Sequence, residues 1–244
     1  SHPMNKYALI AWSTRVINKA KQTKYPQFQN SALNIEYLQK LTKFSIEDNG
    51  PVLAQQELKK IGIALIIEPH LPQTYLDGAA IMTDIKSPII GLTLRFDRID
   101  NFWFNLMHEL AHIMLHLNQG TNLFYDDLER PDLSNIQEQE ADKLADEALI
   151  PESAWNNSPA KLLLTPDAAQ NLASKLNIHT AIVIGKMRSY FRGAGYIRSG
   201  KCEVRKFFCC HLLRMTRAQH SKIVLQRNIE LLLQVIIKQD IFLR

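Results

Sequence analysis

Outside one narrow stripe of polar side chains, the segment 99–116 is almost entirely apolar, and this feature constrains the fold more than any other. On a helical projection the stripe is about 100° wide, and its members are Asn101, Asn105, His108, Glu109, His112 and His116. Residues 99–129 contain no Lys or Arg, which an ordinary solvated helix face would carry. Burying histidines beside a glutamate is costly unless they are paired or hold a metal ion. The segment therefore predicts a largely buried helix whose polar stripe lines a metal site.

The stripe contains the pattern His-Glu-x-x-His at His108, Glu109 and His112. Residues four apart on a helix differ by only ~40° around the axis and ~6 Å along it, so their imidazoles can converge on one ion. Glu109 is offset by ~100° from His108, next to the open position of the metal, where a general base for water belongs. His116 lies ~12 Å along the axis from His108, too far to share the ion. We interpret it as a packing residue or a support for a ligand.

A catalytic zinc ion usually takes three protein ligands and leaves one position for water, so a third ligand is needed. The next predicted helix, 136–149, has an inward apolar face formed by Ala141, Leu144, Ala145, Ala148 and Leu149. Glu138 and Asp142 flank that face, whereas Glu140 and Glu147 point away from it. We therefore predict Glu138 as the third ligand and Asp142 as a hydrogen-bond acceptor for a ligand histidine. The alternative is an exposed acidic helix start favoured by the helix dipole.

The remaining patterns predict an α+β fold, with a small sheet packed against helices and helical segments at both ends. Apolar residues at helical spacing occur at 5–22, 32–47, 50–58, 166–176 and 179–191. Short β-branched runs bounded by Pro and Gly occur at 63–67, 79–83 and 89–94. The helix with the polar stripe is expected to extend to 118, and 117–135 is predicted to be a loop. The helix that starts after Asn49 is expected to stop at Gly62.

The C-terminal part has a different composition from the rest. The net charge of the chain is +5, yet residues 185–244 hold 13 Lys and Arg against 3 Asp and Glu. This basic part predicts either a solvated helix surface or contact with nucleic acid or an acidic partner. An apolar and basic stretch at 216–242 predicts one long helix, which needs the body of the domain or a second chain to cover it, so a dimer is one expectation.

Cysteine usage and the lack of long apolar runs bear on the compartment. The three cysteines all fall in the last fifth of the chain, two of them adjacent, which does not suit a disulfide framework. No apolar run approaches the ~18 to 20 residues that span a bilayer, and the first residues lack a signal-peptide pattern. We expect a soluble cytoplasmic protein without a membrane partner.

Several short motifs together resemble the ImmA/IrrE family of metallopeptidases, over about residues 61–208. They are Asp77-Gly-Ala-Ala, Thr93-Leu-Arg-Phe-Asp, Asn101-Phe-Trp-Phe, His108-Glu-Leu-Ala-His112, Tyr125-Asp-Asp-Leu-Glu, Glu138-x-Glu-Ala-Asp142 and Leu149-Ile-Pro151. The resemblance is strongest to the form fused behind a helix-turn-helix module in HigA-like antitoxin regulators. It implies a zincin-like fold, with His108, His112 and Glu138 as zinc ligands and Glu109 as the catalytic base. It also implies a regulatory role, because related members cleave a partner repressor.

The chain departs from the family pattern in two ways. We recognise no helix-turn-helix module in these 244 residues, and the stretch after Phe208 matches nothing known in the family. We accordingly predict a helical segment at 1–50, a metallopeptidase domain at 51–208 and a basic helical tail at 209–244.

Two functions of these residues remain open, and a third possibility, a fragment of a DNA-binding antitoxin, depends on what lies upstream of Ser1. The first is a regulatory zinc endopeptidase that acts on a repressor, an antitoxin or a toxin. The second is a non-proteolytic module that binds a toxin or repressor and uses the metal site structurally or as a sensor. Glu109 favours the first, because a structural site needs no base beside an open position. The oxyanion-stabilising side chain is not determined by the motifs, and Tyr125 and His179 are two candidates.

Overall fold

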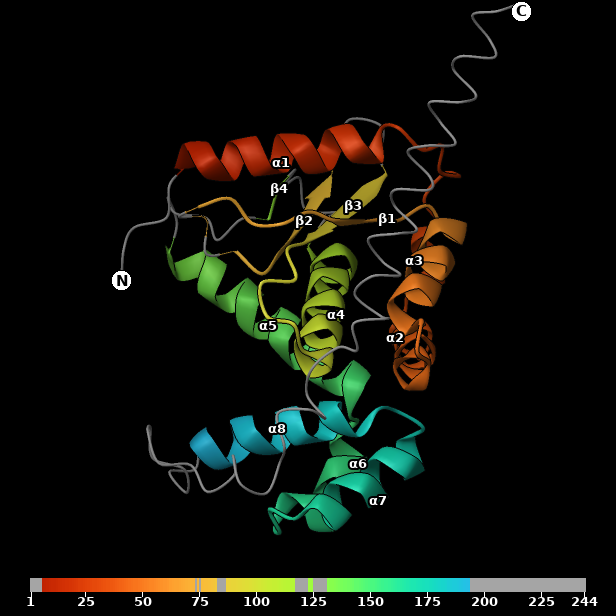
Figure 1. The fold of residues 1–244 in the computed structure, drawn as a ribbon, viewed down its shortest axis with the longest axis vertical. Helices are drawn as coiled ribbons and strands as arrows, with labels where there is room; N and C mark the ends of the chain where they lie inside the picture. Colours follow the sequence, from red (N-terminus) through yellow and green to blue (C-terminus); the bar gives the residue numbers. More distant parts are fainter. Residues whose placement is uncertain are drawn as a thin grey trace, which may run out of the picture.

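A small sheet with helices on both faces forms the part of the chain that the computed structural model describes (Figure 1). The described residues are 6–72, 74, 76–82, 87–116, 123–124 and 131–193. The predicted tail at 209–244 and the candidate Tyr125 lie outside them. None of the described helices combines the length and the apolar character that crossing a bilayer requires.

Four strands build the sheet in the order β1-β3-β2-β4. They are β1 (Ala64–Ile67), β2 (Gly78–Met82), β3 (Pro88–Leu92) and β4 (Leu123–Phe124). β3 pairs parallel with β1 and antiparallel with β2, and β2 also pairs antiparallel with β4. The three β-branched runs in the sequence are therefore confirmed as strands, and the α+β class is confirmed as well.

The helices and short 3-10 turns surround this sheet. They are α1 (Lys6–Ala20), η1 (Asn30–Ala32), α2 (Ile35–Thr42), η2 (Lys43–Ile46), α3 (Gly50–Lys60), α4 (Ile99–Leu115), α5 (Pro131–Leu149), α6 (Glu152–Asn156), η4 (Pro159–Lys161), α7 (Pro166–Leu176) and α8 (Thr180–Gly193). In Figure 1, α1 lies across one side of the sheet, and α4 lies on the other side with α5 beside it. The helices α6, α7 and α8 lie beyond the far end of α4.

Alternate residues of β1 belong to two different cores. Ala64 and Ile66 pack with the α1 side chains Trp12 and Val16, whereas Leu65 packs with the α4 side of the sheet. Successive side chains of a strand point to opposite faces, so a strand covered on both faces is apolar at every position. This explains the uninterrupted apolar run in the sequence.

The apolar side of α4 forms the centre of the larger core. Trp103, Leu106, Met107 and Leu110 are each at most 1% exposed. Burying such a side chain contributes about 1.5–3 kcal/mol to the free energy of folding. This packing fixes the rotation of α4 about its axis, and with it the direction in which the polar stripe faces.

Several predicted boundaries differ from the structure, among them the end of α4, which is at Leu115 rather than at 118. The single helix predicted at 32–47 is interrupted, because the Asn34 side chain accepts a hydrogen bond from the Tyr37 N–H at 2.8 Å and starts α2 at Ile35. The loop predicted up to residue 135 ends earlier, because α5 begins at Pro131. A proline suits the first position of a helix, since the N–H that it lacks would have no partner there. The predicted stop at Gly62 is confirmed by its positive φ of 88°, which favours glycine after a helix end.

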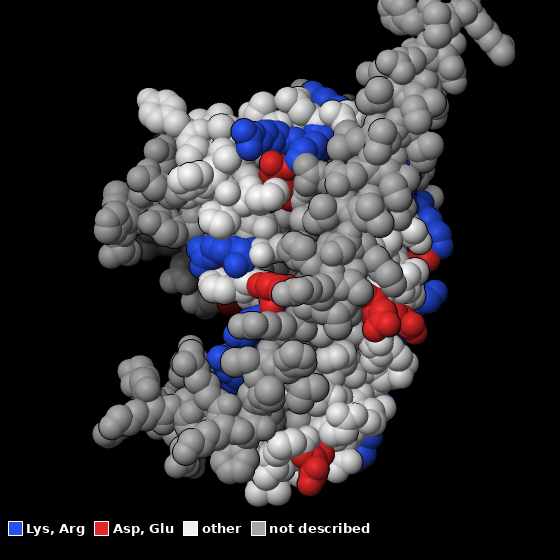
Figure 2. All heavy atoms as spheres, in the orientation of Figure 1, with Lys and Arg blue, Asp and Glu red and all other residues white. Residues whose placement is uncertain are grey.

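Figure 2 shows one face of the molecule, with Lys and Arg in blue and Asp and Glu in red. In the described part of this face the two charge types are interspersed rather than gathered into one patch.

Candidate metal centre

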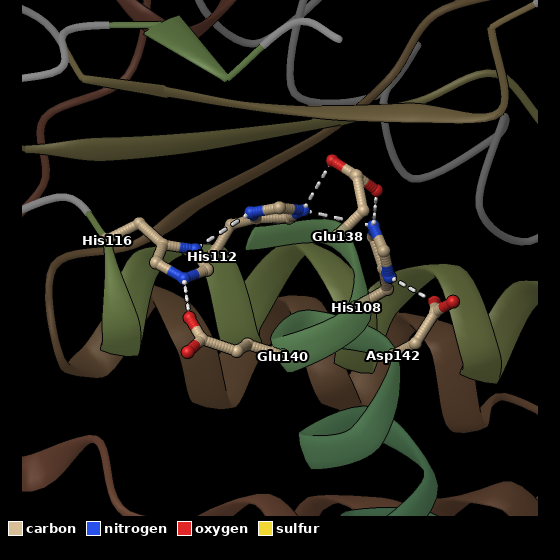
Figure 3. Close-up of polar contacts among 6 residues, drawn as sticks. All are labelled: His108, His112, His116, Glu138, Glu140 and Asp142. Atoms are coloured by element: carbon tan, nitrogen blue, oxygen red, sulfur yellow. Dashed lines mark hydrogen bonds and ion pairs between the residues drawn. The ribbon is translucent and has the colours of Figure 1, made fainter. Parts of the chain in front are cut away.

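Two histidines of α4 and one glutamate of α5 converge on one point (Figure 3). The Nε2 atoms of His108 and His112 are 3.0 Å apart. Glu138 lies across from them, with Oε2 at 3.1 Å from Nε2 of His108 and Oε1 at 3.2 Å from Nε2 of His112. We call His108, His112 and Glu138 the metal group.

The spacing within the metal group fits a zinc ion. Two ligand atoms ~2.0–2.1 Å from a tetrahedral ion are about 3.3 Å apart, from the bond lengths and the tetrahedral angle. The two histidine nitrogens are 3.0 Å apart, and each lies 3.1 to 3.2 Å from a different carboxylate oxygen of Glu138, which is near this spacing. Two imidazole nitrogens and one carboxylate oxygen are also the donor types that zinc prefers in catalytic sites. The structure thus brings together the three side chains that the sequence nominated as ligands.

The charged side chains around the metal group favour a bound cation. Burial lowers the pKa of His108, but contacts with Asp142 and Glu138 and the charge of Glu109 outweigh it and raise the pKa to about 10. Burial raises the pKa of Glu138, and its contacts with His108 and His112 lower it to about 2. The pKa of His112 is lowered, chiefly by burial. A proton on His108 therefore balances the carboxylates, and a divalent cation can replace that proton.

Asp142 lies one turn beyond Glu138 on α5 and contacts the other nitrogen of His108. Its Oδ1 is 2.9 Å from Nδ1 of His108, while its side chain remains 59% exposed. A carboxylate on the outer nitrogen of a ligand histidine holds the ring in place and increases its basicity. The structure therefore places Asp142 where the sequence analysis expected a support for a ligand.

Glu109 is buried and is not a member of the metal group, but it lies close enough for its charge to raise the pKa of His108. It is 6% exposed and lies against the start of β2, since a Cβ added at Gly78 would be only 2.6 Å from its Oε1. A buried carboxylate next to a three-ligand group is placed to accept a proton. Gly78 was not identified from the sequence as a residue of the site, although it belongs to the Asp77-Gly-Ala-Ala motif.

His116, which the sequence analysis interpreted as a packing residue or a support for a ligand, extends the site together with Glu140. Nδ1 of His116 is 3.1 Å from Nδ1 of His112, and Nε2 of His116 is 3.0 Å from Oε2 of Glu140. The prediction placed Glu140 away from the inward face of α5, and its side chain is 57% exposed, but the prediction did not foresee the contact with His116. The prediction used only the apolar face of α5 as its reference. In the structure α5 crosses α4, so its successive acidic side chains meet different turns of α4.

The two candidates for an oxyanion-stabilising side chain gain no support. His179 precedes α8 and its Nδ1 accepts a hydrogen bond from the N–H of Ala181 at 3.1 Å. The N–H of His179 itself donates to Oγ of Ser45 at 2.9 Å. His179 therefore acts as a helix cap. Tyr125 is outside the described residues.

Comparison with known families supports the interpretation of this site. The family model of the IrrE N-terminal-like domain, Peptidase M78, matches residues 59–184. The match includes the sheet, α4 and α5, and therefore every residue of the metal group. No curated protein matches the chain.

Proposed function

The chain belongs to the Peptidase M78 family of IrrE N-terminal-like domains, and from this premise we propose that it is a regulatory zinc endopeptidase. The proposed substrate is a partner repressor or antitoxin protein, and the reaction is the hydrolysis of one of its peptide bonds. The observation that carries the proposal is the buried carboxylate of Glu109 beside three converging ligand side chains. A structural metal site is normally closed by four protein ligands and needs no such base.

Four side chains have distinct roles in the proposed reaction. His108, His112 and Glu138 would hold the zinc ion, which supplies a Lewis acid that polarises the peptide carbonyl and acidifies water. A carboxylate oxygen of Glu109 accepts a proton from the attacking water as the water oxygen bonds to the carbonyl carbon. The C–N bond then breaks, and Glu109 passes the proton to the leaving nitrogen. Burial of Glu109 keeps bulk water from competing for that proton.

The choice of substrate class is supported by the resemblance to members that act in antitoxin regulation. A repressor of that kind is a cytoplasmic protein, so we place the reaction in the cytoplasm. The test is to incubate the zinc-loaded protein with the repressor encoded next to its gene and to map the products by mass spectrometry. We expect one main cleavage, which a chelator stops and added zinc restores. An intact repressor in the presence of the zinc-loaded protein would contradict the proposed substrate.

Gly78 provides a second test of the role of Glu109. A Cβ at this position would lie 2.6 Å from Oε1 and 3.1 Å from Cγ of Glu109, so Gly78→Ala is expected to displace the carboxylate. A misplacement of about 1 Å in a catalytic group can cost about 100-fold in rate. We therefore expect kcat/KM for the repressor to fall by about that factor, while zinc content stays at the wild-type level.

The matched control is Met82→Leu, a substitution of similar volume at the other end of β2. It should leave kcat/KM within about twofold of wild type. Wild-type activity in Gly78→Ala would show that the carboxylate of Glu109 does not need its present position.

A further inference from the structure

A line of contacts connects the metal group to the surface of α5. It runs from Nδ1 of His112 to Nδ1 of His116 at 3.1 Å, and from Nε2 of His116 to Oε2 of Glu140 at 3.0 Å (Figure 3). The other ring nitrogen of His112, Nε2, faces His108 and Glu138. The ring of His116 therefore lies between the metal group and an outer carboxylate.

The order of protons along this line follows from the donor and acceptor types. An ionised carboxylate only accepts, so Nε2 of His116 must carry the hydrogen that reaches Glu140. A neutral imidazole has one N–H, which leaves Nδ1 of His116 as an acceptor. When a metal ion takes the lone pair on Nε2 of His112, the one N–H of that neutral ring is at Nδ1, and Nδ1 of His112 is then the donor in the contact between the two rings.

Burial of the two histidine rings preserves this order of protons. His112 and His116 are 2% and 1% exposed, so water does not replace either ring as a partner. The side chain of Glu140 is 57% exposed and closes the line at the surface. A histidine that only fills space would need no particular nitrogen on either side. Here both nitrogens of His116 lie within hydrogen-bond distance of polar atoms.

We propose that Glu140 and His116 are positioning residues that hold His112 as the Nδ1–H tautomer and aim its Nε2 at the metal ion. This proposal rests on the proposed function for the presence of the ion, but the proton order of His116 is a property of the chain alone. Outer partners of ligand histidines typically change metal affinity by 10- to 100-fold. Glu140 and His116 therefore belong to the site, although neither is within reach of the ion.

The experiment compares two pairs of variants in the full chain. Glu140→Ala removes the outer acceptor at an exposed position, and Glu147→Ala removes another carboxylate of α5, whose Oε2 instead accepts from the N–H of Glu152. His116→Phe removes the acceptor that faces His112. His116→Asn keeps an acceptor, because the Asn side-chain oxygen can occupy nearly the same place as Nδ1 of histidine.

Two quantities are measured for each protein. The first is the zinc dissociation constant, from competition with a chelator. The second is the tautomer of His116, from nitrogen chemical shifts in protein with labelled histidine, with and without zinc. We expect Glu140→Ala to weaken zinc binding about 10-fold and His116→Phe up to about 100-fold. Glu147→Ala should match wild type, and His116→Asn should recover most of the affinity that His116→Phe loses.

The two measurements distinguish a failure of this proposal from a failure of the proposed function. Zinc affinities of Glu140→Ala and His116→Phe equal to wild type would overturn the proposal, and so would an Nδ1–H tautomer at His116. A loss in His116→Asn as large as in His116→Phe would also overturn it, because the acceptor would then be irrelevant. If the wild-type protein bound no zinc, the proposed function would fail, and the tautomer of His116 without metal would still decide the proton order.

Discussion

Replacing Glu109 by Gln is expected to lower the rate of repressor cleavage by about 1,000-fold and to leave zinc binding unchanged. Gln has the shape of Glu, so it fits the same space against Gly78 and the same buried position. Its amide cannot accept a proton from water at neutral pH, so only the base is removed. The measurement is single-turnover cleavage of the repressor beside the zinc content of the same preparation.

This variant also separates the two functions left open by the sequence. A regulatory module that binds its partner without cutting it does not depend on a base, so Glu109→Gln would change nothing that it does. A peptidase loses its activity but keeps its metal ion and its fold. Cleavage at the wild-type rate by Glu109→Gln would remove this residue from the mechanism.

The strands and α4 could be predicted because their sequence patterns reflect which of their faces are buried. Both faces of β1 are covered, so its residues are apolar without interruption, and Pro and Gly mark where the strands end. The stripe on α4 is visible because the other sides of this helix are buried. The geometry of one helix also predicted that His108 and His112 would meet, since a turn of helix has a fixed pitch.

The partners across elements could be predicted only in part. Glu138 was nominated by its position relative to the apolar face of α5, and it does reach both histidines. The contact between Glu140 and His116 was missed because a projection of one helix does not contain the angle at which a second helix crosses it. Gly78 was missed for a similar reason, since its importance depends on how closely α4 approaches β2.

Short elements were the hardest to predict. The five residues of α6 and the three of η4 are too few for a periodic pattern to appear. The order of the strands was also not predictable, because the three runs have similar compositions. β2 pairs with β3 and contacts α4, and this contact brings the backbone of Gly78 next to Glu109.

Replacing His112 by Ala is expected to remove zinc from the protein. The imidazole supplies the Nε2 atom that lies within 3.2 Å of both other members of the metal group. Its loss leaves two of three protein ligands, and the remaining pair cannot complete the set that a catalytic zinc site uses. We expect the zinc affinity to fall by more than about 100-fold, because the loss of a ligand exceeds that of an outer partner.

Unfolding must be distinguished from the loss of a ligand, because His112 is 2% exposed and alanine leaves a cavity. The circular dichroism spectrum of the variant shows whether the helices persist. The matched control is His70→Ala, which removes an exposed histidine outside the metal group.

The most direct test of the metal centre is the zinc content per chain of the wild type, His112→Ala and His70→Ala, purified alike and dialysed against the same zinc buffer. We predict one zinc ion per chain in the wild type and in His70→Ala, and almost none in folded His112→Ala. Equal zinc content in all three proteins, or no zinc in the wild type, would contradict a site built from His108, His112 and Glu138.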